Sequence, residues 1–233
     1  MTASLASESL GDIAVRLPGA SAVFRKHGLD FCCGGRAVLA DAVREHGVDL
    51  DAVTAELQAL DSGAKSDHPH EAAALIDHIL ERYHAVHRRE LPELIRLAEK
   101  VERVHASHPQ VPAGLASLLW RMSEDLETHM KKEEAVLFPM MRQPRRPIIA
   151  HPIARMRIEH DDHGAHLRAL EAITRGHEAP AEACGSWRAL YAGTRKLTDD
   201  LMQHIHLENN VLFPQFATDL PTTPICPGML AEG

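Results

Sequence analysis

The sequence predicts an all-α protein in which a small N-terminal helical domain is followed by an up-and-down four-helix bundle. Aromatic residues make up only 4% of the 233 residues, and Ala, Leu, Glu and Arg are abundant. This composition favours helix over sheet. Four long segments also carry apolar residues at spacings of three and four, as one face of a helix requires. Short connections between them indicate antiparallel neighbours.

The first 60 residues are expected to form the small domain. Pro18 and Gly19 interrupt its first apolar run, and its last helix is expected to begin at Asp49 or Asp51, as N-cap, and to end at Leu60. The polar segment at 61–70, DSGAKSDHPH, is expected to be a linker. Residues 219–233 are Pro-rich and are expected to be an irregular tail.

The bundle is expected to occupy residues 71–218. Its helices are predicted to run from Pro69 to about His105, from near Pro112, from Pro147 or Pro152 to Gly176, and from Pro180. Pro92 should kink the first helix, because a proline inside a helix removes a backbone hydrogen bond. In the second helix, Val136 and Met140 are expected to lie on the inward-facing stripe.

The bundle sequence contains an internal repeat. DLETHMKKEEAVLFP and DLMQHIHLENNVLFP share the pattern D-L-x-x-H-x-x-x-E-x-x-V-L-F-P at an offset of 75 residues, and His84 and His160 are 76 residues apart. The bundle therefore reads as two copies of one helix hairpin. Each copy supplies one histidine from its first helix and a His-x-x-x-Glu pair from its second.

Six side chains of the repeat are candidate metal ligands: His84, His129, Glu133, His160, His204 and Glu208. Residues four apart lie on one helix face, and these faces otherwise carry Leu, Met and Val. A buried carboxylate without a partner is prohibitively costly, and one or two metal ions would remove that cost. A single His-x-x-x-Glu pair is common on exposed helices, but two pairs in register are not.

The ligand types favour iron or manganese over structural zinc, which prefers cysteines in a closed tetrahedron. If each glutamate bridges two ions, each ion has two imidazoles and two carboxylate oxygens. That leaves room for a bridging oxo or hydroxo group and one exchangeable position, so we expect a labile or reactive dinuclear centre. Four other histidines are interpreted as surface residues or as neighbours of the ligands: His87, His163, His166 and His206.

The stretch GLDFCCGG places Cys32 and Cys33 side by side before two glycines. We expect the thiols at an exposed bend, with positive φ at the glycines. The pair could be incidental. Alternatively it is a mobile thiol pair that ligates iron in transit, reduces the centre or forms a mixed disulfide with a partner, with the linker letting the small domain swing.

The sequence leaves the roles of four further residues open and excludes some classes of partner. Glu159 and Asp125 could orient an imidazole, could guide iron or protons, or could be exposed charges. Cys184 and Cys226 have no evident role. The formal charge of −8 argues against a nucleic-acid partner. We find no apolar run of about 20 residues, so no membrane partner is expected. The start of the sequence does not resemble a secretory signal, so we expect a cytoplasmic location. Homodimerisation remains open.

The DFCCGG motif followed by the H…HxxxE…H…HxxxE bundle resembles the Repair of Iron Centres family (YtfE/ScdA type) over residues 10 to 217. The resemblance implies a hemerythrin-like bundle with a non-haem di-iron centre, in which Glu133 and Glu208 bridge the irons. It implies that His84 and His129 serve one iron and that His160 and His204 serve the other.

The resemblance also implies a role in restoring iron–sulfur clusters damaged by nitric oxide or peroxide, in the bacterial cytoplasm. Gly164 stands where oxygen-carrying hemerythrins have a fifth histidine, which argues against oxygen carriage. The leading hypothesis is iron delivery to damaged iron–sulfur proteins, with Cys32 and Cys33 assisting. The alternatives are reduction of nitric oxide to nitrous oxide, and a sensing module that responds to nitric oxide or dioxygen.

Overall fold

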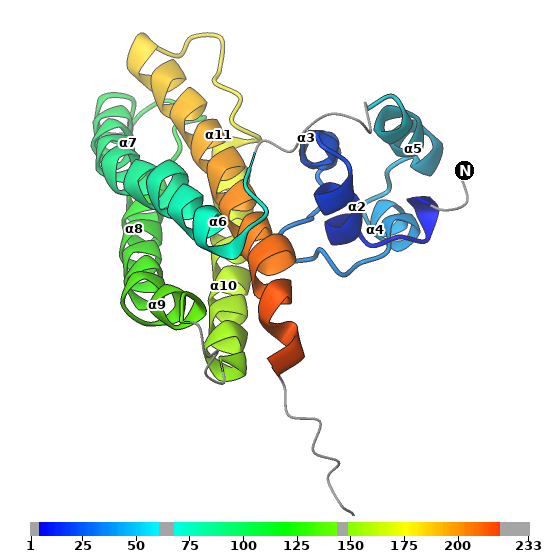
Figure 1. Ribbon diagram of the computed structural model, residues 1–233. Helices are drawn as coiled ribbons and strands as arrows, with labels where there is room; N and C mark the ends of the chain where they lie inside the picture. The colour runs from blue at the N-terminus through cyan, green and yellow to red at the C-terminus, as the bar shows by residue number, and fades with distance from the viewer. Residues whose placement is uncertain (1–4, 61–67, 144–148, 220–233) are drawn as a thin grey trace, which may run out of the picture.

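The computed structural model describes residues 5–60, 68–143 and 149–219, with side chains to residue 216. Throughout these ranges the regular elements are helices, apart from one isolated bridge between Ser9 and Val38. Figure 1 shows a bundle of long helices beside a cluster of short ones. The predicted all-α fold, with a small helical domain followed by a four-helix bundle, is therefore confirmed. None of the described helices is long and apolar enough to cross a lipid bilayer.

Among the described residues, the small N-terminal unit contains the short helices α2 (Leu10–Arg16), α3 (Ala20–Lys26), α4 (Leu39–Glu45) and α5 (Leu50–Gln58). The Ser9 side chain caps α2, and the Asp49 side chain caps α5 by accepting from the Asp51 amide, as predicted. Ile13, Phe24 and Phe31 are fully buried within the unit, which has its own apolar core. Most of the expected linker, 61–67, and the tail from 220 lie outside the described residues.

The bundle is formed by four long helical stretches. The first comprises α6 (Ala72–Ile79), η1 (Leu80–His84) and α7 (Ala85–Val104), and the second α8 (Leu115–Lys132), η2 (Glu133–Leu137) and α9 (Phe138–Met141). The third is α10 (Ala150–Thr174), and the fourth comprises α11 (Gly185–His206), η3 (Leu207–Leu212) and η4 (Phe213–Asp219). The four stretches begin within five residues of the predicted prolines, and the first and third end within two residues of the predicted His105 and Gly176.

Three of these stretches contain a π-helical turn: η1, η2 and η3. A π turn has hydrogen bonds from i to i+5, so it shifts every later residue around the helix axis. The prediction that Val136 lies inward is wrong for this reason: Val136 is 50% exposed. Leu137 and Met141 occupy the interior instead, while Met140 is only half-buried. Each π turn contains one candidate ligand, namely His84, Glu133 or Glu208.

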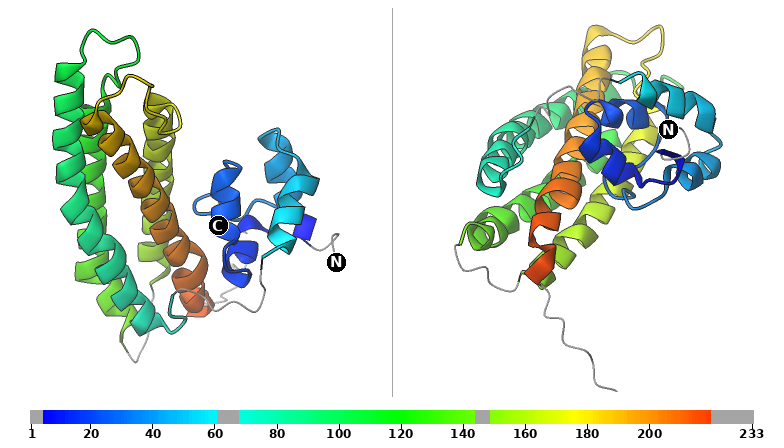
Figure 2. Two further views of the ribbon diagram at one scale, coloured as in Figure 1. Left: turned by 90° about the horizontal axis from the view of Figure 1, so that it is seen from above. Right: turned by 45° about the vertical axis from the view of Figure 1, so that its right-hand side comes forward.

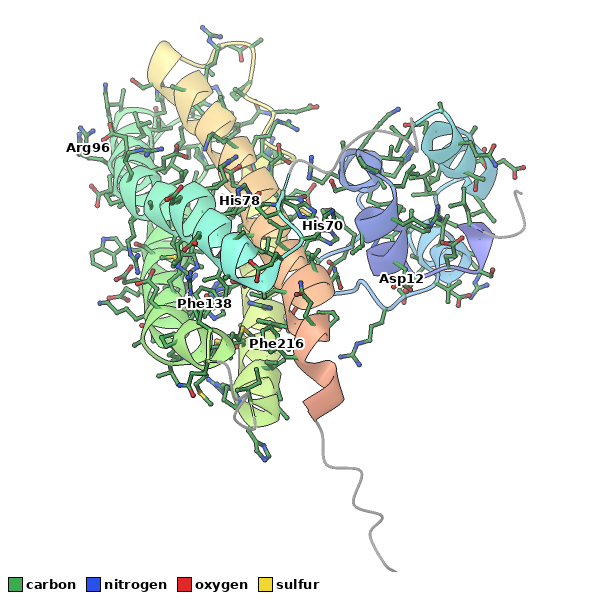
Figure 3. The ribbon with its side chains drawn as sticks, viewed as in Figure 1. Asp12, His70, His78, Arg96, Phe138 and Phe216 are labelled. Carbon is green, nitrogen blue, oxygen red and sulfur yellow. The ribbon has the colours of Figure 1, made fainter. Side chains whose placement is uncertain are left out.

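Two apolar clusters fill the bundle, and the candidate ligands lie in a band between them. One cluster surrounds Trp187 and Leu119, and the other surrounds Ile76 and Phe213. Along each of the four helical stretches, the candidate ligands lie near the point where residues of one cluster give way to residues of the other. Phe138, labelled in Figure 3, belongs to the second cluster and is buried in the bundle. Water is therefore excluded from the band on both sides.

The small unit is docked against the bundle near α10 and α11, as both views in Figure 2 show. Arg25 forms an ion pair with Asp199 of α11 at 3.2 Å. The Asn210 side chain donates a hydrogen bond to the carbonyl of Phe31 at 3.0 Å. These contacts place the loop that carries Cys32 and Cys33 directly over the bundle.

Candidate metal centre

The structure brings all six candidate ligands together inside the bundle. Each of them is at most 1% exposed. Two groups have ligand atoms close enough to hold one ion each: His84, Glu133, His204 and Glu208 form the first, and His129, Glu133, His160 and Glu208 form the second. The two glutamates belong to both groups, so the arrangement is that of a dinuclear site with two shared carboxylates.

Each shared carboxylate presents one oxygen to each group. The Oε2 atom of Glu133 lies 3.4 Å from His84 Nε2, and its Oε1 atom lies 3.5 Å from His129 Nε2. The Oε1 atom of Glu208 lies 3.1 Å from His204 Nε2, and its Oε2 atom lies 3.0 Å from His160 Nε2. This is the geometry of two bridging glutamates.

The pairing of histidines implied by the family resemblance is wrong. His84 Nε2 lies 3.2 Å from His204 Nε2, and His129 Nε2 lies 3.1 Å from His160 Nε2. The first helical stretch therefore shares a group with the fourth, and the second shares one with the third. Because the first stretch packs against both the second and the fourth, sequence spacing alone could not choose between the two pairings.

The residues fit a pair of cations. Both carboxylate oxygens of Glu133 are buried and have no hydrogen-bond partner among the described residues. Burial and the neighbouring Glu208 raise the pKa of Glu133 well above its usual range. Burial would also raise the pKa of Glu208, but His204 and His160 hold it well below that range. Two facing carboxylates in a dry core are stable together when positive charge lies between them.

Two of the candidate ligand histidines are oriented by the residue that follows each shared glutamate. The Nδ1 atom of His84 donates to the Glu134 carboxylate at 2.8 Å, and that of His160 donates to the Asn209 side-chain oxygen at 2.9 Å. Such contacts fix the ring and leave Nε2 free to bind a metal. The sequence reasoning missed both residues, although Glu134 and Asn209 occupy equivalent positions in the repeat.

The other two candidate ligand histidines contact residues that differ from each other in chemistry. The Nδ1 atom of His129 donates to Glu159 at 3.0 Å, and that hydrogen bond, together with Lys132 and Arg155, holds the pKa of Glu159 well below its usual range. His204 instead stacks flat on Tyr83 at 5.5 Å, and its Nδ1 atom has no hydrogen-bond partner among the described residues. Tyr83 and Glu159 are also equivalent in the repeat.

Glu159 thus orients an imidazole, one of the roles that the sequence left open. The imidazole is that of His129, on the facing helix. Asp125 instead lies near His166, with 3.8 Å between the Oδ2 and Nε2 atoms. His87, His163 and His206 are at most 3% exposed, so the structure rules out the surface alternative for these three.

The expected exposure of the cysteine pair is wrong. Cys32 is only 3% exposed and Cys33 is half-buried, because Asn209 and Asn210 bind the loop onto the bundle. Positive φ at the glycines is also wrong: neither is among the described residues with positive φ. Gly35 is required by close packing instead, since a Cβ atom there would lie 2.7 Å from the Phe31 carbonyl oxygen.

The thiols lie next to the centre. The Cys33 thiol donates to the carbonyl of His160 at 3.2 Å, and its Sγ would lie 3.2 Å from a Cβ at Gly164. It therefore lies against the helix position where oxygen-carrying hemerythrins have a histidine. The two Sγ atoms are 3.7 Å apart, and the Cys33 contact and burial raise the pKa of Cys32 well above its usual range.

Asn209 links this loop to the candidate ligands. Its side-chain nitrogen donates to the Cys32 carbonyl at 3.0 Å while its oxygen accepts from His160. Cys184 lies apart from the centre, as the half-buried N-cap of α11, 3.2 Å from His105 Nε2. Cys226 lies outside the described residues.

Comparisons with known proteins agree with this geometry. Residues 75–216 match the model of the hemerythrin HHE cation binding domain, and residues 6–61 match the ScdA-type N-terminal domain, which is described as a domain of unknown function. An iron–sulfur cluster repair protein YtfE from Cronobacter sakazakii is 49% identical over 210 residues, which cover 89% of this chain and 95% of that protein.

Two further relatives carry the same name. The protein from Salmonella schwarzengrund is 46% identical over 89% of this chain and 96% of its own length. That from Citrobacter koseri is 46% identical over 91% of this chain and 97% of its own length. With the two buried groups of ligands, the match confirms the predicted cofactor, a non-haem di-iron centre. The chain belongs to the Repair of Iron Centres family, whose bundle is a hemerythrin HHE cation binding domain.

Proposed function

We propose that this chain repairs iron–sulfur clusters damaged by nitrosative or oxidative stress, by delivering iron from its buried centre. The observation that carries the proposal is the construction of the centre, in which Glu133 and Glu208 are each shared between two groups of ligands. The name printed for the relatives, iron–sulfur cluster repair protein, supports the same function. We place the activity in the cytoplasm, with damaged iron–sulfur proteins as partners.

The proposed ligands are the six residues of the two groups: His84, His129, Glu133, His160, His204 and Glu208. Each ion would receive two imidazole nitrogens and two carboxylate oxygens, which is fewer than the six ligands that iron commonly takes. Iron held in this way is exchangeable, and it is the component that a damaged cluster lacks. Glu134, Asn209 and Glu159 keep three of the imidazoles in the orientation that binds a metal.

Cys32 and Cys33 would receive iron as it leaves the centre. Oxygen and sulfur atoms of Asp30, Cys32 and Cys33 lie within 4.8 Å of one another, a spacing that can hold a metal ion. The Cys33 thiol contacts the backbone of His160, so the two sites are neighbours. Thiolate is the metal-binding form, and an incoming cation favours it over the protonated thiol.

The test is to mix the iron-loaded chain, without oxygen, with a [4Fe–4S] hydrolyase whose cluster has been damaged by peroxide or by nitric oxide. We expect recovery of hydrolyase activity above that given by the same amount of free ferrous iron. The H129A/H204A variant should give no more than free iron, and C32S/C33S should slow the recovery. Equal recovery with the chain and with free iron would refute the proposal.

A second candidate function is the reduction of nitric oxide, which the shared carboxylates favour because they would place two ions side by side. Two molecules of nitric oxide, two electrons and two protons would give nitrous oxide and water. Nitrous oxide produced over several turnovers, with an added electron donor, would support this function. Cluster repair by the chain, together with no nitrous oxide when nitric oxide and the electron donor are supplied, would leave iron delivery as the function.

A further inference from the structure

The two hairpins of the bundle are equivalent in sequence, but they are covered differently at the centre. Four residues after the candidate ligand of its first helix, the first hairpin has Arg88 and the second has Gly164. Glu134 and Asn209 are equivalent in the same way, one residue after each shared glutamate. The residues at these positions determine what lies over each of the two groups of candidate ligands.

In the first hairpin, a side chain of the bundle itself covers the candidate ligand. The guanidinium of Arg88 donates to both carboxylate oxygens of Glu134, at 2.7 Å and 3.1 Å. It also donates to Glu127 at 2.7 Å. Glu134 in turn accepts from the ring of His84. A bidentate contact of this kind fixes both side chains, so the cover over His84 is a fixed part of the bundle.

In the second hairpin, the loop that carries Cys32 and Cys33 (the thiol loop) takes the place of that arginine. A Cβ atom at Gly164 would lie 3.2 Å from the Cys33 Sγ atom, so Cys33 occupies the space that a side chain there would need. Cys33 also donates to the carbonyl of His160 at 3.2 Å. The Asn209 side chain, which orients the ring of His160, donates to the carbonyl of Cys32. The cover over His160 therefore belongs to the small unit.

The small unit is not closely packed against the bundle. A cavity of about 920 Å³ lies between them, lined by Leu29 and Cys32 of the small unit and by Leu167 and Met202 of the bundle, among others. Close-packed protein interiors contain few voids larger than a water molecule. Each unit also has an apolar core, and an interface between such units opens more readily than either unit unfolds.

The two groups do not differ in how many of their imidazoles are oriented by a carboxylate. Glu134 contacts His84 in the first group, and Glu159 contacts His129 in the second. Both groups also share the same two glutamates. The groups therefore differ in what covers them rather than in their ligands, and this difference bears on the rate at which an ion leaves.

We propose that the thiol loop is a removable cover over the second group, which contains His129 and His160. Undocking of the small unit releases the ion at this position, whereas Arg88 keeps the ion held by His84 and His204 in place. The proposal rests on the proposed function, and it adds that each chain delivers one ion and retains the other. The step is an exchange of ligands on ferrous ion, without a change in its oxidation state.

The test follows the release of ferrous ion from the full, reduced, iron-loaded chain into an excess of a coloured ferrous chelator, without oxygen. We expect two phases of equal size, each of one ion per chain, because the two positions are covered differently. After the fast phase, chain separated from the chelator should retain one ion. A single phase that releases both ions would overturn the inference.

Variants of the first hairpin should change only the slow phase. R88A removes the bidentate contact with Glu134 and should accelerate the slow phase by at least about threefold. The matched control is R89A, because Arg89 is its neighbour on the same helix and contacts Glu90 instead. R89A should release both ions like the parent chain, and equal rates for R88A and R89A would contradict the role assigned to Arg88.

Variants of the docking contacts should change only the fast phase. N210A removes the hydrogen bond to the Phe31 carbonyl and should accelerate the fast phase by at least about threefold. Entry and exit of the ion change alike when the cover opens, so the affinity at equilibrium stays the same. D199N removes the ion pair with Arg25 at an exposed position, so its result does not depend on tolerance of a buried substitution.

The repair assay separates this inference from the proposed function. Chain recovered after repair of a damaged cluster should retain one ion. Acceleration of the same phase by R88A and N210A would overturn the inference. Cluster repair together with single-phase release would leave the proposed function intact, whereas release in two phases without repair would refute that function alone.

Discussion

Replacing Asn209 by Ala should weaken both the metal centre and the docking of the thiol loop. The change removes a hydrogen bond of 2.9 Å to His160 and one of 3.0 Å to the Cys32 carbonyl. Two buried polar groups then lack partners, at about 1–3 kcal/mol each, so the metal-free chain should lose about 2 kcal/mol or more of unfolding free energy. Loss of a group that orients a ligand costs about 10–100-fold in metal affinity, or about 1.4–2.7 kcal/mol.

The assays are urea denaturation of the metal-free chain and titration of the iron-loaded chain with a competing chelator. The matched control is N210A, because Asn210 donates to the Phe31 carbonyl of the same loop but contacts His206 rather than a candidate ligand. Both variants should lose stability, and only N209A should lose metal affinity. Equal metal affinity in the two variants would refute the role assigned to Asn209 in orienting His160.

Three further outcomes are expected. G35A should lower the free energy of unfolding by about 1–3 kcal/mol, because its Cβ would collide with the Phe31 carbonyl. The measurement is urea denaturation, with G185A as the control because the space around its Cβ is open. Equal urea midpoints for the two variants would contradict the packing argument. The rate of Cys184 alkylation should rise with pH around a midpoint near 7, since hydrogen bonds from the α11 backbone and the His105 contact lower its pKa to about 7. The rate is measured by peptide mass spectrometry in a C226S background, and H105A should move the midpoint upward. A wild-type midpoint near 9 would contradict the His105 contact. Anaerobic removal of iron should lower the melting temperature by about 10–20 °C, since two ions, each at 100 times its Kd, contribute about 5.4 kcal/mol together. Calorimetry before and after re-addition of ferrous iron checks this, and an unchanged transition would contradict stabilisation of the bundle by the metal.

The fold and the candidate ligands could be predicted because their signals are local and repeated. Apolar spacing and the positions of proline predicted the long helices, and the duplicated His-x-x-x-Glu pattern predicted which faces meet. The pairing of His84 with His204 could not be predicted in this way. The pairing depends on which neighbouring helix each side chain points towards, and this is determined by how the helices pack in three dimensions.

The remaining errors have similar physical causes. Val136 was misplaced because a π turn cannot be recognised from apolar spacing, which assumes a constant number of residues per turn. The burial of Cys32 depends on contacts with Asn209 and Asn210, more than 170 residues away in the sequence. The role of Glu134 could have been predicted from the internal repeat, since Glu134 follows Glu133 just as Asn209 follows Glu208.

The π turns also bear on the history of the chain. The turns η2 and η3 occupy equivalent places in the two hairpins, and each contains a glutamate that the two candidate groups share. The turn η1 ends at His84, whereas α10 runs unbroken through the equivalent His160. If a π turn records the insertion of one residue into an α-helix, the insertion beside the glutamate is older than the duplication of the hairpin, and the insertion before His84 is younger. Under that assumption, the two halves of the bundle share an ancestor that already carried a distorted helix at its glutamate, and they diverged afterwards in the first helix.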